Sequence, residues 1–109
     1  MKEVVIVAAV RTAIGSFGGS LKDISAAKIG GELVKQALED INLNPNLVDE
    51  IIFGNVLQTG LGQNVARQIA VNAGIPKEKS AFVVNKVCGS GLKSVVLGVQ
   101  SITVDRKSV

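Results

Sequence analysis

Ala81-Phe-Val-Val-Asn-Lys-Val-Cys-Gly-Ser-Gly-Leu92 runs from a short apolar stretch through a glycine-bearing turn into a second apolar segment. Residues 81–85 are predicted to form a strand, since short runs rich in Val and Phe are typical of buried strands. After the turn, apolar residues recur at the spacing of one helix face. They are Leu92, Val95, Val96, Val99 and Ile102. A strand that leads through a turn into a helix indicates an α/β protein.

The preceding part of the chain shows the same alternation. An apolar run at 48–54 predicts a strand, and a glycine-bearing loop follows it at 54–62. The spacing of the next apolar residues predicts a helix at 65–73, which Gly74 and the nearby Pro76 should end. These two elements bring the chain to the strand at 81–85.

The first part of the chain completes the pattern. The run Glu3-Val-Val-Ile-Val-Ala-Ala9 is of the kind found in parallel strands buried on both faces. A helix capped by Asp23 or Ser25 is predicted to extend to about Ile41, because its apolar residues lie at helical spacing. The order βαβαβα predicts a mostly parallel sheet covered by helices. Since the pattern finishes on a helix with no strand behind it, we expect the sheet to be incomplete.

Composition excludes several classes of protein. The 109 residues suffice for one domain or part of one, and 47% hydrophobic residues with 3% aromatic ones predict a core of Val, Ile, Leu and Ala. The net charge of +3 comes from scattered Lys and Arg, without the basic stripe and stacking aromatics of a nucleic-acid-binding protein. The apolar run at 4–10 is too short to span a membrane and has no cleavage site after it. We expect a soluble, cytoplasmic protein with neither a nucleic-acid nor a membrane partner.

A glycine-rich loop at 15–20 raises the question of nucleotide binding. It reads Gly-Ser-Phe-Gly-Gly-Ser, which lacks both the G-x-x-x-x-G-K-[ST] and the G-x-G-x-x-G spacing that surrounds a phosphate with backbone N–H groups. We therefore interpret it as a structural loop.

The single cysteine, Cys88, is the candidate functional residue. One Cys and no His exclude an internal disulfide and a Cys/His metal site. Taken alone, Cys88 is either a small buried hydrophobe or a reactive thiol. Its place between a strand and a helix N-terminus favours the reactive thiol, because ligands bind beyond the carboxyl ends of parallel strands and helix N-termini favour negative charge. Gly89 and Gly91 would let backbone and substrate approach closely, as in the nucleophile elbow of hydrolases.

Three segments resemble the thiolase family. Val84-Asn-Lys-Val-Cys-Gly-Ser-Gly-Leu-Lys-Ser-Val95 is similar to the thiolase signature around the acyl-enzyme cysteine. Val10-Arg-Thr-Ala-Ile-Gly-Ser-Phe-Gly-Gly-Ser-Leu21 and Gly54-Asn-Val-Leu-Gln-Thr-Gly-Leu-Gly-Gln-Asn-Val-Ala-Arg-Gln68 agree in order and spacing. The resemblance covers residues 1–102, leaves 103–109 as a divergent tail, and is strongest to bacterial acetyl-CoA acetyltransferases.

The resemblance implies reversible Claisen chemistry between coenzyme A thioesters, without a further cofactor. Cys88 would carry the acyl group as a thioester, and its backbone N–H would help to bind the oxyanion. Gly89 and Gly91 are assigned to turn geometry, and Ser90 to capping the helix. Acetyl-CoA or another acyl-CoA is the expected substrate, and the resemblance implies homo-oligomeric, tetrameric full-length relatives.

The departures from the family limit these expectations. Thiolases are several times longer and carry a Gly-His-Pro histidine, an Asn-Glu-Ala-Phe segment and a second cysteine, none of which occurs here. We therefore expect an N-terminal piece of a thiolase, from a gene fragment, a frameshifted copy or an excised segment, with negligible turnover alone. A non-catalytic binding or assembly module on the same half-fold is the alternative, and another condensing enzyme of the superfamily ranks below both.

Overall fold

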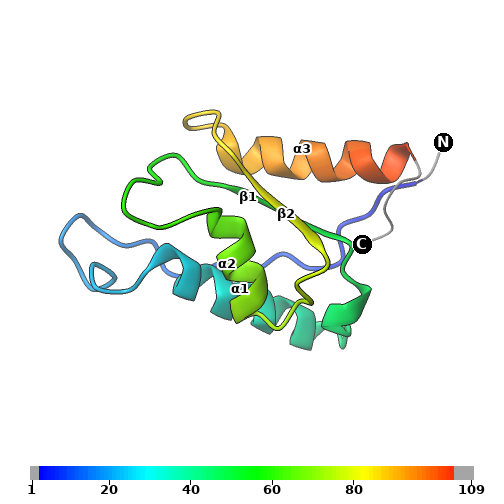
Figure 1. Ribbon diagram of the computed structural model, residues 1–109, viewed down its shortest axis with the longest axis horizontal. Helices are drawn as coiled ribbons and strands as arrows, with labels where there is room; N and C mark the ends of the chain where they lie inside the picture. Colours follow the sequence, from blue (N-terminus) through cyan, green and yellow to red (C-terminus); the bar gives the residue numbers. More distant parts are fainter. Residues whose placement is uncertain (1–2, 105–109) are drawn as a thin grey trace.

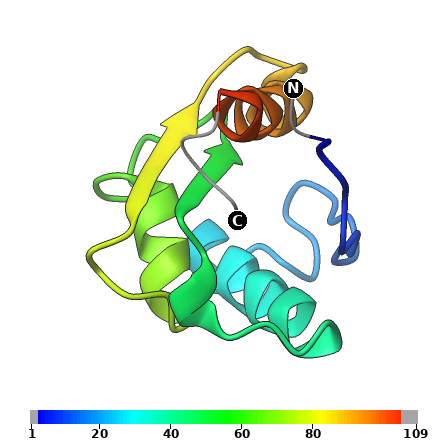
Figure 2. The same cartoon turned by 90° about the vertical axis from the view of Figure 1, so that its right-hand side faces the viewer.

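The computed structural model describes residues 3–104 and has three layers, with helices on both faces of a small sheet (Figures 1 and 2). In chain order the elements are α1 (Ala26–Asp40), the 3-10 helix η1 (Pro45–Leu47), β1 (Glu50–Gly54), α2 (Val65–Asn72), β2 (Ser80–Val84) and α3 (Ser90–Thr103). Helices α1 and α2 lie on one face of the sheet and α3 lies on the other (Figure 1). The predicted α/β class is confirmed.

The sheet of the described residues consists of β1 and β2, which pair in parallel. The register places Glu50 opposite Ser80 and Gly54 opposite Val84. Because the strands are parallel, both reach the same edge of the sheet at their carboxyl ends. Both strands lie where the sequence predicts them, to within a few residues.

The helix ends follow from local chemistry. The Ser25 hydroxyl accepts a hydrogen bond from the backbone N–H of Lys28 (3.1 Å), which confirms one of the two predicted caps of α1. Helix α2 ends in a Schellman motif, in which Gly74 adopts a left-handed φ of 84°. There the backbone N–H of Ile75 donates to the carbonyl of Ala70 (2.9 Å).

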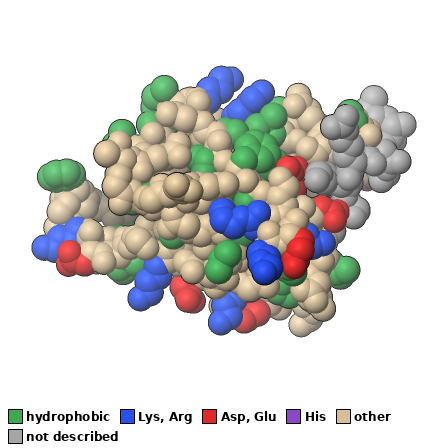
Figure 3. Space-filling view, viewed as in Figure 1, with side chains coloured by type: hydrophobic (Ala, Val, Ile, Leu, Met, Phe, Trp, Pro, Cys, Tyr) green, Lys and Arg blue, Asp and Glu red, His purple; other side chains and the backbone are tan. Residues whose placement is uncertain are grey.

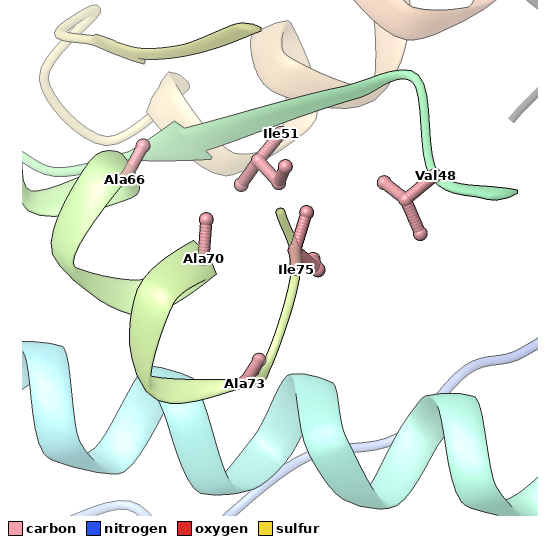
Figure 4. Close-up of a cluster of buried hydrophobic side chains, with 6 residues drawn as sticks. All are labelled: Val48, Ile51, Ala66, Ala70, Ala73 and Ile75. Carbon is pink, nitrogen blue, oxygen red and sulfur yellow. The ribbon is translucent and has the colours of Figure 1, made fainter. Parts of the chain in front are cut away.

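Small aliphatic side chains form the core between the sheet and α2 (Figure 4). The cluster consists of Val48, Ile51, Ala66, Ala70, Ala73 and Ile75. This composition confirms the expected core. Alanines supply half of this cluster. Because their side chains are small, the interior can be filled only if the helices lie close to their neighbours.

Glycines let α1 and α2 approach each other closely. A Cβ atom at Gly30 would lie 2.5 Å from Cδ1 of Ile69, and one at Gly31 would lie 2.5 Å from Cβ of Asn72. The Asn72 side chain also donates a hydrogen bond to the carbonyl of Ala27 (3.1 Å). The predicted apolar stripe of α1 is only half-buried, and the glycine pair beside it forms the most buried part of the helix.

The strand predicted at residues 3–9 does not form. This segment has no regular secondary structure, and Ile6 keeps 77% of its surface exposed. A hollow lies beside this segment, lined by Glu3, Val4, Val5 and Val7 together with Ile41, Leu43 and Ile102. A strand buried on both faces needs a sheet edge to pair with and covering helices on either side. Residues 3–9 pair with neither strand of the described sheet, although their composition suits a strand.

Charged side chains are spread over the surface without a continuous basic patch on the face shown in Figure 3. No helix within residues 3–104 is both long and apolar enough to cross a membrane. Most of the tail predicted to diverge, residues 103–109, lies outside the described residues.

Candidate active site

The candidate site lies at the carboxyl edge of the sheet. The backbone N–H of Asn55 donates to the carbonyl of Val84 (3.1 Å), which extends the parallel pairing just beyond the strands. From this point the chain departs in two loops, 55–62 after β1 and 85–89 after β2 (Figure 1). Ligands of open α/β sheets bind at this kind of edge.

The turn that presents Cys88 is closed by backbone hydrogen bonds. The N–H of Gly89 donates to the carbonyl of Lys86 (2.9 Å), and the N–H of Ser90 donates to the carbonyl of Val87 (3.2 Å). Val87 adopts a φ of 49° within this turn. A left-handed conformation is rare for a β-branched residue and costs on the order of 1–3 kcal/mol. The strain at this turn therefore falls on the residue before the cysteine, while Gly89 keeps a φ of −91°.

Ser90 does not have the capping role that the sequence suggested. The N-cap residue of α3 is Gly89, and no side chain caps this helix end. The Ser90 hydroxyl instead accepts a hydrogen bond from the N–H of Lys86 (2.8 Å) and donates one to the carbonyl of Val87 (2.7 Å). Because Ser90 is the first residue of the helix, its side chain reaches back into the turn rather than forward to the free N–H groups.

Cys88 is exposed at the N-terminus of α3, so it is not a buried core residue. Within residues 3–104, no acceptor is found for the backbone N–H of Cys88 or for those of Gly91 and Leu92 in the first helical turn. No acidic residue lies in that turn. Free N–H groups at a helix N-terminus attract negative charge, so this end of α3 can stabilise an anion beside the thiol.

The start of α3 rests directly on the end of β1. A Cβ atom at Gly54 would lie 2.5 Å from the carbonyl carbon of Ser90 and 2.6 Å from the nitrogen of Gly91. No side chain fits in that space, and only glycine lets the strand support the turn. Gly91 itself has nothing within 4 Å of its Cβ position, so the crowding lies on the Gly54 side of this contact.

The amide side chains of Gln68 and Asn85 hold the loop at 54–62, a role that the sequence did not predict. Nε2 of Gln68 donates to the carbonyls of Leu61 and Gln63, each at 2.8 Å. Asn85 connects this loop to the Cys88 turn, since its Oδ1 accepts from the N–H of Val87 (3.0 Å) and its Nδ2 donates to the carbonyl of Val56 (3.4 Å). An Asn two residues before a turn position is a known turn signal, whereas Gln68 carries no signal of its own within a helix.

The resembling segment at residues 10–21 lies apart from this turn. Among the described residues, no hydrogen bond joins it to residues 85–91, and Ile14 and Phe17 are fully or almost fully exposed. An apolar cavity of about 310 Å³ lies between α1, α2 and the end of β1, and Cys88 does not line it. The site therefore consists of the Cys88 turn, the start of α3 and the adjoining end of β1.

Replacement of Val87 by glycine is expected to leave stability unchanged or to raise it by up to about 1 kcal/mol. Glycine removes the steric cost of the left-handed φ, and its greater freedom in the unfolded chain offsets part of the gain. Val87→Ala, which keeps a Cβ atom, is the matched control and should show no such gain. Urea unfolding followed by circular dichroism would measure both variants. A loss of more than about 1 kcal/mol for Val87→Gly would contradict the assignment of strain to this residue.

Fold and site together define an α/β domain that presents an exposed cysteine between a parallel strand and a helix. Residues 4–109 match the sequence model of the thiolase N-terminal domain. The chain therefore belongs to the thiolase family.

Individual relatives agree with this family. An acetyl-CoA acetyltransferase of Syntrophomonas wolfei is 54% identical over 101 residues, covering 93% of this chain and 26% of that protein. One from Clostridioides difficile is 55% identical over 94 residues, which are 86% of this chain and 88% of the relative. The Acat5 thiolase of Ascaris suum, solved in complex with coenzyme A, has a TM-score of 0.89 and 42% identity and covers 92% of this chain. This chain spans about a quarter of the length of the S. wolfei and A. suum proteins, at 26% each.

Proposed function

We propose that Cys88 accepts an acyl group from an acyl-CoA thioester, as the first half of a Claisen condensation or thiolysis. The observation that carries this proposal is the exposed thiol of Cys88 beside three backbone N–H groups without an acceptor in the described structure. A carbonyl oxygen that becomes negatively charged beside the sulfur could be bound by such donors. The names of the relatives, acetyl-CoA acetyltransferases, and the coenzyme A bound to the A. suum protein support acetyl-CoA as the substrate.

The acyl-transfer step can be written in full for this turn. The sulfur of Cys88 attacks the thioester carbonyl carbon, and a tetrahedral intermediate with a negatively charged oxygen forms. When that intermediate collapses, the bond between the carbonyl carbon and the coenzyme A sulfur breaks, and the proton of the Cys88 thiol ends on coenzyme A. Acetyl-Cys88 and free coenzyme A are the products. Gly89 and Gly91 contribute by leaving space beside the sulfur, since neither carries a side chain.

The second half of the reaction needs groups that this sequence does not contain. A second acetyl-CoA must lose a proton from its α-carbon, and the resulting carbanion must attack the acyl carbon while the Cys88 sulfur leaves. The sequence has no His and no second Cys to serve as the base and acid. Cooperating catalytic groups lose orders of magnitude in rate when one is removed. We therefore expect this chain alone to stop at the acyl-enzyme.

Intact mass spectrometry after incubation with acetyl-CoA tests the proposal. We expect one acetyl group per chain, located on Cys88 by peptide mapping, and no acetoacetyl-CoA in the solution. The acetyl group should be released by neutral hydroxylamine, which cleaves thioesters and leaves acetyl-lysine intact. An unmodified chain whose circular dichroism shows it to be folded would refute the proposal.

A non-catalytic assembly role is the second candidate, and the surface of α3 favours it. Leu92 is 72% exposed and Val95 is 49% exposed, so one side of this helix presents apolar side chains without a cover in the described structure. If assembly were the function, the folded chain would associate in sedimentation velocity runs and would take up no acetyl group. If Cys88 becomes acetylated while the chain remains monomeric, the result would favour the acyl-transfer role over the assembly role.

A further inference from the structure

We infer that Ser90 is a positioning residue for acyl transfer, and that its buried hydroxyl holds the strained turn in the conformation that aims the Cys88 N–H and sulfur. The inference rests on the proposed function of Cys88. It assigns to Ser90 a role distinct from helix capping. It also includes Asn85, an exposed residue whose side chain hydrogen-bonds to the same turn.

Burial distinguishes Ser90 from the other polar residues. Within residues 3–104 it is the one buried polar residue, with 5% of its surface exposed. Both the acceptor and the donor capacity of its hydroxyl are used inside the turn, at 2.8 Å from the N–H of Lys86 and 2.7 Å from the carbonyl of Val87. The buried hydroxyl holds the N–H of Lys86 and the carbonyl of Val87 near each other, because rotation at Val87 would take the carbonyl away and leave the hydroxyl without its acceptor.

The backbone conformation that needs to be held is that of Val87. Val87 has a φ of 49°, a conformation that its β-branched side chain disfavours. Its carbonyl is bound by Ser90, and its N–H is bound by Oδ1 of Asn85 at 3.0 Å. The peptide that follows Val87 carries the N–H of Cys88. Rotation at Val87 would therefore redirect the N–H that is proposed to bind the oxyanion.

The start of the helix supports Ser90 from the other side. The backbone of Ser90 and Gly91 packs on Gly54, where even a Cβ atom would be too close. This packing fixes the start of α3 to the sheet. The Ser90 hydroxyl then connects the start of α3 to the Cys88 turn. The Cys88 turn is held from the sheet at Ser90 and from the loop at 54–62 through Asn85.

Two reactions of the same thiol separate positioning from general reactivity. Acyl transfer creates an oxyanion and depends on the direction of the N–H donors, whereas alkylation by iodoacetamide displaces iodide and creates no oxyanion. In Ser90→Ala we expect acetylation by acetyl-CoA to slow by at least about tenfold, since small displacements of a catalytic group cost up to about a hundredfold. Alkylation should change by less than about threefold, because the thiol stays exposed.

The matched control is Ser94→Ala, one turn further along α3. The Ser94 hydroxyl donates to the carbonyl of Gly91 (2.6 Å), so this variant also loses a side-chain hydrogen bond to the backbone, but outside the turn. We expect both of its rates to stay within about twofold of the unchanged chain. Asn85→Ala, which removes the exposed hold, should slow acetylation several-fold and spare alkylation.

A double variant tests how Ser90 acts. Glycine at position 87 accepts the left-handed φ without steric cost, so the turn would depend less on the hydroxyl. We expect the loss caused by Ser90→Ala to be at least about threefold smaller in the Val87→Gly background. An equal loss in both backgrounds would overturn the inference that Ser90 acts by holding Val87.

A second acyl donor, 4-nitrophenyl acetate, distinguishes a failure of this inference from a failure of the proposed function. If acetyl-CoA leaves the unchanged chain unmodified but 4-nitrophenyl acetate acetylates Cys88 with the same Ser90 dependence, the positioning role stands and the coenzyme A reaction fails. If Ser90→Ala is acetylated at the original rate, the positioning role fails and the proposed function stands. An equal slowing of acetylation and alkylation would also overturn the positioning role. Circular dichroism of each variant would detect loss of the fold, and Asn85→Ala then serves as the deciding variant.

Discussion

Cys88→Ala is expected to take up no thioester-linked acetyl group from acetyl-CoA, whereas the unchanged chain takes up one. Cys88 is the only cysteine in the sequence, so no other thiol can replace it. The residue is exposed, so alanine fits its position without disturbing the buried side chains. The expected effect on acyl transfer is therefore complete, while the expected effect on stability is below about 0.5 kcal/mol.

Two comparisons make this result specific. Cys88→Ser keeps an oxygen nucleophile in the same turn, but a hydroxyl needs a base to attack a thioester and the sequence has no His. We expect it to be acetylated at least about a hundredfold more slowly than the cysteine. Lys86 and Lys93 flank the turn and can be acetylated directly, so peptide mapping assigns each acetyl group to its residue, and release by neutral hydroxylamine identifies the thioester. A hydroxylamine-sensitive acetyl group on Cys88→Ala would contradict the assignment.

Gly54→Ala is expected to lower the free energy of unfolding by about 3 kcal/mol, the upper end of the range for overpacked sites. The added Cβ atom would lie 2.5–2.7 Å from the backbone of Ser90 and Gly91, and backbone atoms cannot move away without shifting the helix. At Gly30 the equivalent atom would meet the side chain of Ile69, which can change rotamer. Gly30→Ala should therefore cost less than Gly54→Ala, although both contacts start at 2.5 Å.

Gly98→Ala is the control for this substitution. Gly98 lies within α3 and has nothing within 4 Å of its Cβ position, so alanine should raise stability by about 0.5–1 kcal/mol through its helix preference. Urea unfolding would measure these variants under the same conditions. Because α3 carries the Cys88 turn, Gly54→Ala should also slow acetylation of whatever fraction remains folded. Equal stabilities of the Gly54 and Gly98 variants would show that the strand does not support the helix as described.

Features encoded by neighbouring residues could be predicted from the sequence. The helix at 26–40, its Ser25 cap, and the end of the helix at 65–72 before Gly74 all follow from spacing and end signals. The parallel pairing of 50–54 with 80–84 follows from two strands separated by a helix. The exposed position of Cys88 follows from its place between the strand and the helix.

Features that depend on residues distant in the sequence were either not predicted or predicted wrongly. Residues 3–9 have the composition of a buried strand but remain unpaired in the described structure. The glycine pair at 30–31 carries no apolar signal, yet it sets the distance between α1 and α2. Ser90 looked like a helix cap because it precedes the apolar helix face, and its hydroxyl instead bonds backward into the turn.

The Cys88 turn has some features that the local sequence determines and others that only the tertiary structure determines. Residue types and spacing were sufficient to locate the turn and the cysteine that it presents, because a strand, two glycines and a helix start are local features. The tertiary structure decided the conformation of Val87, the hydrogen bonds of the Ser90 hydroxyl and the support from Gly54. A β-branched residue locally disfavours a φ of 49°, so only hydrogen bonds and packing from the surrounding fold can hold it there.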